Sequence, residues 1–146
     1  MSVRRKANKL AVGAALLSGA LWAQDAATPA GLAVVDPVLS QIENGVPSGT
    51  GHLYYPGETV YLAFRVQGYK REEKQDERKF LKVNWRVELR DSSKRLVVQP
   101  FTGKIDSELA EQDKEWKPKQ HWQALLPPLM PSGDYQLTIT LADEYA

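Results

Sequence analysis

Three segments of the chain alternate apolar and polar residues with a period of two. They span 59–67, 81–90 and 135–141, and in each of them every second residue is Val, Leu, Ile or an aromatic residue. This period places the apolar side chains on one face of a β-strand, whereas at helical spacing the same residues would be spread around the cylinder. The pattern therefore predicts three strands, each with one apolar face.

Shorter apolar runs predict further strands between turn signals. Residues 31–35 form a candidate edge strand closed by Asp36-Pro37, residues 96–98 follow a turn at 91–94, and residues 122–126 end at two prolines. The charged insertion 103–120 spaces Ile105 and Leu109 for one turn of helix. Because strands with one apolar face pack in pairs about 10 Å apart, we expect an all-β fold, an antiparallel β-sandwich of about six to seven strands.

The first 23 residues have the layout of a secretory signal peptide. Residues 1–9 are polar and basic, and residues 10–23 are apolar or small apart from Ser18. An apolar run of about 14 residues reaches about 21 Å as a helix, which is too short for a hydrocarbon core of about 30 Å. We expect cleavage after Ala23, no stable membrane span afterwards, and a secreted or periplasmic product. Leu21 departs from the usual cleavage pattern, so an uncleaved interfacial anchor is the alternative.

Length and composition limit the organisation of the remaining chain. A chain of 146 residues suits a single domain, so we divide it into the signal 1–23, a flexible N-terminal segment 24–50 with the candidate edge strand, and the sandwich 51–146. The absence of cysteine excludes disulfides, thiolate zinc sites and a cysteine nucleophile. The net charge is +1, and four of the basic residues lie within the first nine positions, so nucleic acid is not an expected partner.

The spacing of the strands resembles that of immunoglobulin-like sandwiches. Segment 59–67 resembles strand B, segment 81–90 with an inward Trp85 resembles strand C, and segment 135–141 resembles strand F. Leu126, Pro131, Gly133 and Tyr135 resemble a tyrosine corner, in which a Tyr at the start of F bonds to the backbone just upstream.

The stretch Tyr55-Pro56-Gly57-Glu58-Thr59-Val60, with Gly133-Asp134-Tyr135 and Asp143, resembles immunoglobulin-like or macroglobulin-like modules of secreted bacterial proteins. The resemblance covers about positions 50 to 146 and implies a fold rather than an activity.

One departure from this family concerns the final strand. In a seven-strand sandwich a last strand pairs beside F, but residues 143–146 are too few to form one. We therefore expect the final strand to be missing and the F edge to be unpaired. Truncation, or filling of the gap by residues 31–35, is preferred over a strand donated by a partner.

Aromatic side chains supply the candidate binding residues. Trp116 and Trp122, together with Tyr54 and Tyr55, could form a platform for a sugar ring or a peptide, although a Trp in a polar loop more often covers the edge of a core. The mixed-charge segment 69–79 predicts a solvated loop, and contact with a partner is its alternative role.

No catalytic or metal-binding pattern emerges from the sequence. His52 and His121 are the two histidines, and neither has a ligand-spaced partner nearby; no nucleophile elbow or calcium loop is present. We expect no enzyme activity, no catalytic residues, no metal and no cofactor.

The sequence thus predicts an exported, non-catalytic binding, adhesion or spacer module whose partner is a protein or a component of the cell envelope. A carbohydrate-binding or protease-inhibiting sandwich is the alternative function. An enzyme using His121 is a third hypothesis.

Overall fold

A computed structural model of the chain describes residues 7–16, 22–23, 31–48, 53–113 and 115–146, with residues 7–16 and 22–23 described by their backbone. The part described contains nine strands and one short 3-10 helix, and no α-helix occurs in it. In chain order the elements are β1 (Ala7–Leu16), β2 (Trp22–Ala23), β3 (Ala33–Ser40), β4 (Thr59–Gln67), β5 (Glu72–Glu73), β6 (Lys79–Arg90), β7 (Phe101–Leu109), η1 (Glu111–Asp113), β8 (Lys119–Leu125) and β9 (Gly133–Asp143).

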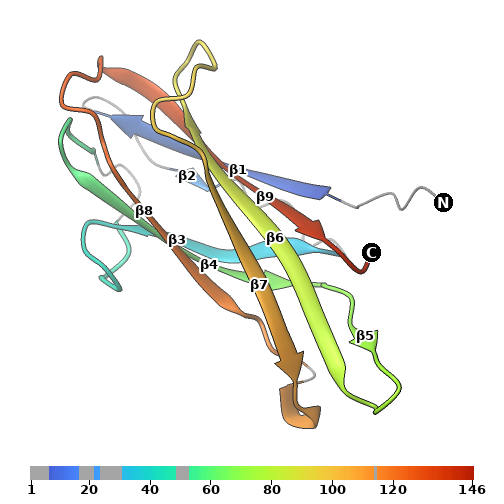
Figure 1. Cartoon of the computed structure of the whole chain (residues 1–146). Helices are drawn as coiled ribbons and strands as arrows, with labels where there is room; N and C mark the ends of the chain where they lie inside the picture. Colours follow the sequence, from blue (N-terminus) through green and yellow to red (C-terminus); the bar gives the residue numbers. More distant parts are fainter. Residues whose placement is uncertain (1–6, 17–21, 24–30, 49–52, 114) are drawn as a thin grey trace.

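The strands form two antiparallel sheets. One sheet has the order β3-β4-β8, and the other has the order β2-β1-β9-β6-β5, with β7 also pairing with β6. Figure 1 shows both sheets running along the length of the molecule. The expected all-β sandwich is confirmed, with about seven principal strands.

The three strands predicted from clean alternation are all present. Segment 59–67 is β4, segment 81–90 lies within β6, and segment 135–141 lies within β9. In β4 and β6 the buried positions alternate with less buried ones along nearly the whole strand. The period of two was therefore a reliable guide wherever the inward residues are large and apolar.

The first edge strand is longer than predicted. We expected residues 31–35 to stop at Asp36-Pro37, but β3 continues to Ser40. Its pairing with β4 shifts between Val35 and Val38, and Asp36 has a φ of 49°. Asp tolerates this left-handed conformation, and a bulge accommodates a proline that has no N–H to donate. The two residues bend the strand without ending it.

Two predictions for the segment 96–109 are wrong. Residues 96–98 do not form a strand, since only Leu96 makes an isolated bridge, to Arg90. Ile105 and Leu109 lie on strand β7 rather than on a helical turn, and β7 pairs with β6 from Phe101 to Leu109. A spacing of four residues fits a strand as well as a helix, because both positions then face the same side of the sheet.

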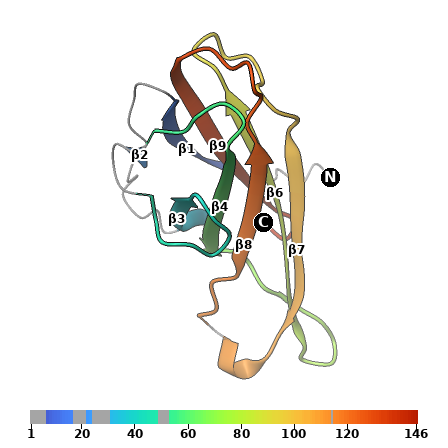
Figure 2. The same cartoon turned by 90° about the vertical axis from the view of Figure 1, so that its left-hand side faces the viewer.

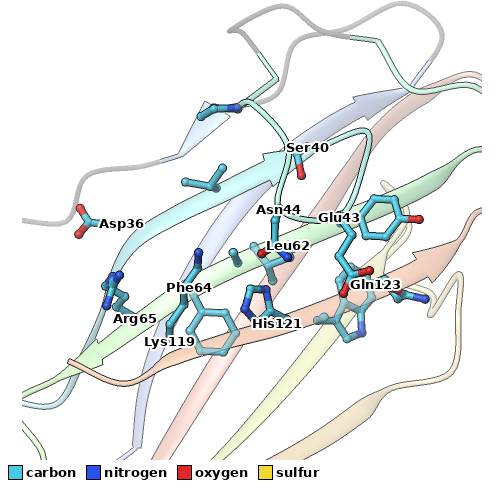
Figure 3. Close-up of a pocket in the computed structure, with 16 residues that line it drawn as sticks. Asp36, Ser40, Glu43, Asn44, Leu62, Phe64, Arg65, Lys119, His121 and Gln123 are labelled. Atoms are coloured by element: carbon cyan, nitrogen blue, oxygen red, sulfur yellow. The ribbon is translucent and has the colours of Figure 1, made fainter. Parts of the chain in front are cut away.

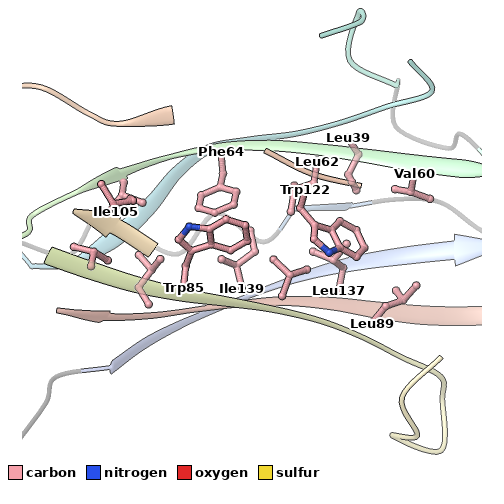
Figure 4. Packing of buried hydrophobic residues seen from close by; sticks show 14 of the residues in the cluster. Leu39, Val60, Leu62, Phe64, Trp85, Leu89, Ile105, Trp122, Leu137 and Ile139 are labelled. Atoms are coloured by element: carbon pink, nitrogen blue, oxygen red, sulfur yellow. The ribbon is translucent and has the colours of Figure 1, made fainter. Parts of the chain in front are cut away.

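The core lies between the two sheets. Leu62 and Phe64 point inward from β4, and Trp85, Leu137 and Ile139 point toward them from β6 and β9 (Figure 4). The Trp85 and Phe64 rings meet edge to face with centroids 5.2 Å apart. The Trp85 Nε1 also donates a hydrogen bond of 3.2 Å to Gln120 Oε1, so the indole is held by a ring contact and by a polar contact.

The predicted tyrosine corner is formed. The Tyr135 hydroxyl donates a hydrogen bond of 2.6 Å to the carbonyl oxygen of Pro131, four residues upstream. The ring is buried, with 4% of its residue surface exposed. This bond satisfies a hydroxyl that burial would otherwise leave without a partner, and it fixes the turn that leads into β9.

Because two tyrosines are buried, the stability of the fold should depend on pH in the alkaline range. Burial raises the pKa of Tyr135, and the charge of Asp91 raises it further; burial also raises the pKa of Tyr54. In the unfolded chain both phenols titrate near their ordinary value of about 10, so above this pH unfolding releases protons. We expect the free energy of unfolding to fall as pH rises beyond about 10. Urea titrations across this range should show a shallower fall for Tyr135→Phe; an identical slope would contradict the assignment.

The outer edge of β9 is occupied, contrary to the expected unpaired F edge. Strand β1 runs antiparallel to β9 from Ala7 opposite Ala142 to Leu16 opposite Gly133. Residues 31–35 do not fill this gap, because residues 33–35 belong to β3 in the other sheet.

The end of β9 also anchors a distant loop. The buried carboxylate of Asp143 accepts hydrogen bonds from the backbone N–H of Lys70, at 2.6 Å, and of Tyr145, at 3.0 Å. Asn84 on β6 donates a further bond of 2.7 Å to Glu144. These contacts join the loop after β4 to the last residues of β9.

Candidate binding surfaces

The four aromatic residues predicted to form a platform do not lie on one surface. Tyr54 and Trp122 belong to the hydrophobic core, with 0% and 7% of their surfaces exposed. Trp122 lies opposite Leu62 on the inward face of β8, and the Tyr54 hydroxyl shares a hydrogen bond of 3.2 Å with the Ser48 hydroxyl. Both side chains stabilise the fold from within.

The two exposed members lie at opposite ends of the sandwich. Tyr55 precedes the start of β4, and Trp116 precedes the start of β8. Since Thr59 pairs with Leu125 and Arg65 pairs with Lys119, these starts are about 20 Å apart along the strands. Tyr55 and Trp116 therefore cannot stack on one sugar ring, although each is accessible separately.

Exposed apolar side chains gather instead at one end of the molecule. Figure 2 shows the loops 91–100 and 126–132 at the top, where β6 and β8 end. Residues 53–58 lie at this same end, because β4 begins there, whereas the loop 41–48 folds back over the outer face of its sheet beside Ala63 and His121. The largest exposed fractions there are 92% for Leu129 and 65% for Leu125. We call this set the apolar end: Tyr55, Leu96, Leu125 and Leu129.

The opposite end is charged. It carries the loop 68–78 around β5 and the loop 110–118 around η1, at the bottom of Figure 2. Residues 70–78 are all exposed, as the mixed-charge pattern predicted. Lys74 and Arg78 lie over the ring of Phe80 at 4.2 and 5.6 Å, and the Tyr69 hydroxyl donates to the Trp116 carbonyl at 2.5 Å. These contacts order the loops but leave their charges in solvent.

A polar groove crosses the outer face of the sheet β3-β4-β8. Its volume is about 330 Å³, and the side chains around it include two acids, two bases and one histidine (Figure 3). Ala63 and His121 are cross-strand neighbours on its floor, so the small Ala63 side chain helps to create the hollow. The polar side chains that line it are Asp36, Ser40, Glu43, Asn44, Tyr61, Arg65, Lys119, His121 and Gln123.

One wall of the groove is the loop 41–48, which is held in shape by hydrogen bonds of its own backbone. Ser48 N–H donates to the Leu39 carbonyl at 2.7 Å, which closes the loop 41–48 at its base. Gly45 N–H donates to the Ile42 carbonyl at 3.0 Å, and Asn44 has a φ of 53° in this tight turn. Sequence reasoning missed the groove because its residues come from three separate segments with no shared local pattern.

His121 is exposed, and in the described parts of the chain no hydrogen bond links its ring to a carboxylate or a hydroxyl. Across those same residues, no three His, Asp or Glu side chains cluster closely enough to hold a metal ion. His52, the other histidine, lies outside the described residues. The groove can offer hydrogen bonds and opposite charges to a bound group.

Comparison with known proteins yields no relative: the chain matches no protein-family model, no curated protein and no solved structure. No helix in the described residues has both the length and the apolar character that a membrane span requires.

Proposed function

We propose that this chain is an exported, non-catalytic, immunoglobulin-like module that binds another protein through its apolar end. The observation that carries the proposal is the concentration of exposed Leu and Tyr side chains at a single end. Soluble proteins rarely gather large apolar side chains in solvent unless another surface covers them. The charged loops at the other end keep that end hydrated.

The strand order supports the immunoglobulin-like assignment. The sheet β3-β4-β8 corresponds to strands A, B and E of such sandwiches, and β9-β6 corresponds to F and C. The tyrosine corner at Tyr135 lies at the start of the F-like strand, where that family places it. In such sandwiches, recognition is commonly carried by the loops at one end.

The carbohydrate-binding alternative has less support than protein binding. It relied on the paired rings of Trp116 and Trp122, and Trp122 is buried in the core. Ala substitutions at this pair would damage the fold and so could not isolate a sugar site. The apolar end presents aliphatic side chains, which suit a protein surface better than a sugar hydroxyl.

Site-specific photocrosslinking in the producing cells tests the proposed surface. A photoreactive phenylalanine at Leu129 is expected to give one discrete crosslinked product, because this side chain is 92% exposed at the apolar end. The matched control carries the same group at the exposed Gln112 on η1, at the charged end.

The crosslinked protein is then identified, purified and titrated against the chain. Leu96→Asp with Leu125→Asp should weaken its binding at least about tenfold, since a charge placed in an apolar contact must be desolvated. Gln112→Asp should leave binding unchanged. Equal crosslinking from positions 129 and 112, or unaltered affinity of the double variant, would overturn the proposal.

A further inference from the structure

The outer edge of β9 receives a strand along nearly its whole length. Ten consecutive residue pairs join β1 to β9, from Ala7 opposite Ala142 to Leu16 opposite Gly133, without a register shift. On its other side β9 pairs with β6. Strand β1 therefore takes the place that a final strand would occupy in the sheet, as Figure 1 shows.

The central part of the β9 edge lacks the features that protect free strand edges. From Tyr135 to Ala142 the strand contains no proline and no charged residue. By contrast, β3 carries Pro37 and a bulge, and β7 presents exposed charged residues, Lys104, Asp106 and Glu108, at alternate positions. Prolines, bulges and charges discourage pairing with foreign strands. The β9 edge is thus suited to permanent pairing.

The same strand contributes a row of almost completely buried side chains to the core. Leu137, Ile139 and Leu141 have at most 1% of their surfaces exposed. Loss of the neighbouring strand would uncover unpaired N–H and C=O groups directly beside this row. Such an edge binds an extended segment readily, because the backbone supplies the hydrogen bonds and the core supplies apolar contact.

Strand β1 lies inside the predicted export signal. Residues 7–16 overlap its basic start and its apolar run, and cleavage after Ala23 would separate them from the sandwich. Export with cleavage would therefore remove the strand that covers the β9 edge.

We propose that the outer edge of β9 is an acceptor site for an extended peptide strand of another protein, which residues 7–16 occupy until the signal is removed. This inference rests on the export part of the proposed function. The occupant expected is an antiparallel segment of about ten residues, rich in small and apolar residues and almost free of charge, as β1 itself is.

Peptide exchange on the folded full chain tests the acceptor site. A specific protease site is placed between residues 24 and 30, and the folded chain is cut there, so that residues 1–23 remain bound only by contacts. The probe is a fluorescent peptide with the sequence of residues 7–16. We expect its anisotropy to rise with the cut chain, with at least about tenfold more peptide bound than with the uncut chain.

A peptide carrying Val12→Pro is the matched control, because proline lacks the N–H that a paired strand requires. Its uptake should be lost. Equal uptake by cut and uncut chains, equal uptake of both peptides, or no uptake once residues 1–23 have dissociated would overturn the proposal. Dimerisation of the cut chain without peptide uptake would also overturn it, since a second copy would then cover the edge.

The mass of the chain recovered outside the cytoplasm tests the export step separately. A chain that is exported and cleaved but takes up no peptide refutes the acceptor site alone. A chain found outside the cytoplasm that keeps residues 1–23 refutes the cleavage on which the acceptor site depends and makes β1 a permanent strand, whereas a chain found only in the cytoplasm refutes the export part of the proposed function. Binding through the apolar end is read from the crosslinking experiment and is independent of both results.

Discussion

Replacing Trp85 by Ala should lower the free energy of unfolding by about 3–5 kcal/mol, the range typical of large aromatic side chains removed from a core. Only 3% of Trp85 is exposed, and its ring contacts Phe64 and Phe101 at centroid distances of 5.2 and 5.3 Å. The substitution removes these ring contacts, leaves a cavity between the sheets, and deprives Gln120 of its hydrogen bond. Urea or thermal unfolding of the two proteins measures the loss.

The same substitution at an exposed tryptophan, Trp116→Ala, is the control for Trp85→Ala. Trp116 is 40% exposed and lies outside the core cluster, so its loss should cost less than that of Trp85. A cost below about 1 kcal/mol for Trp85→Ala would contradict the inward assignment of β6. An equal loss of unfolding free energy at the two positions would also contradict this assignment.

A methyl group added at Gly103 should destabilise the protein by about 1–3 kcal/mol, the usual cost of overpacking. Gly103 on β7 lies directly opposite Trp85 on β6, and a Cβ atom at this position would collide with the indole ring. The indole is held by Phe64, Phe101 and Gln120, so it cannot move aside cheaply. Denaturant titration of Gly103→Ala measures the effect.

The cause of this effect can be isolated by combining the two substitutions. In a Trp85→Ala background the collision disappears, and Gly103→Ala should become neutral or stabilising by up to about 1 kcal/mol, because alanine restricts the unfolded chain more than glycine does. If Gly103→Ala costs the same in both backgrounds, contact with the indole is not the reason for the glycine.

The sequence predicted strands where the inward positions are filled by large apolar residues, and failed where they are not. In β6 the inward row is Leu, Val, Trp, Val and Leu, so the period is plain. In β7 the row on the Trp85 side is Phe101, Gly103, Ile105, Ser107 and Leu109, so a glycine and a serine interrupt it, and Ile105 and Leu109 match a helical spacing equally well. The glycine is present because Trp85 needs the space, which is a tertiary requirement that no local pattern records.

The candidate sites were harder to predict than the fold. Alternate residues of β8 face the core, and Trp122 is one of them. Its burial could have been inferred from the sequence if the strand had been taken to begin at Lys119. The apolar end and the polar groove each combine segments from distant parts of the chain, and only the strand pairing brings them together. The N-terminal apolar run was also ambiguous, because such a composition suits both a signal sequence and a β-strand.

The position of β9 in its sheet limits when the protein can fold. The central strand β6 pairs with β9 over eight residues, from Val83 to Arg90, and the loop at Lys70 is tied to Asp143. A ribosome makes β9 after all the other strands, and until it emerges the sheet lacks its middle pair. Long-range pairing of this kind delays folding. We therefore expect this sheet to close only after β9 has left the ribosome, and a chain destined for export would until then be open enough to enter a translocation channel.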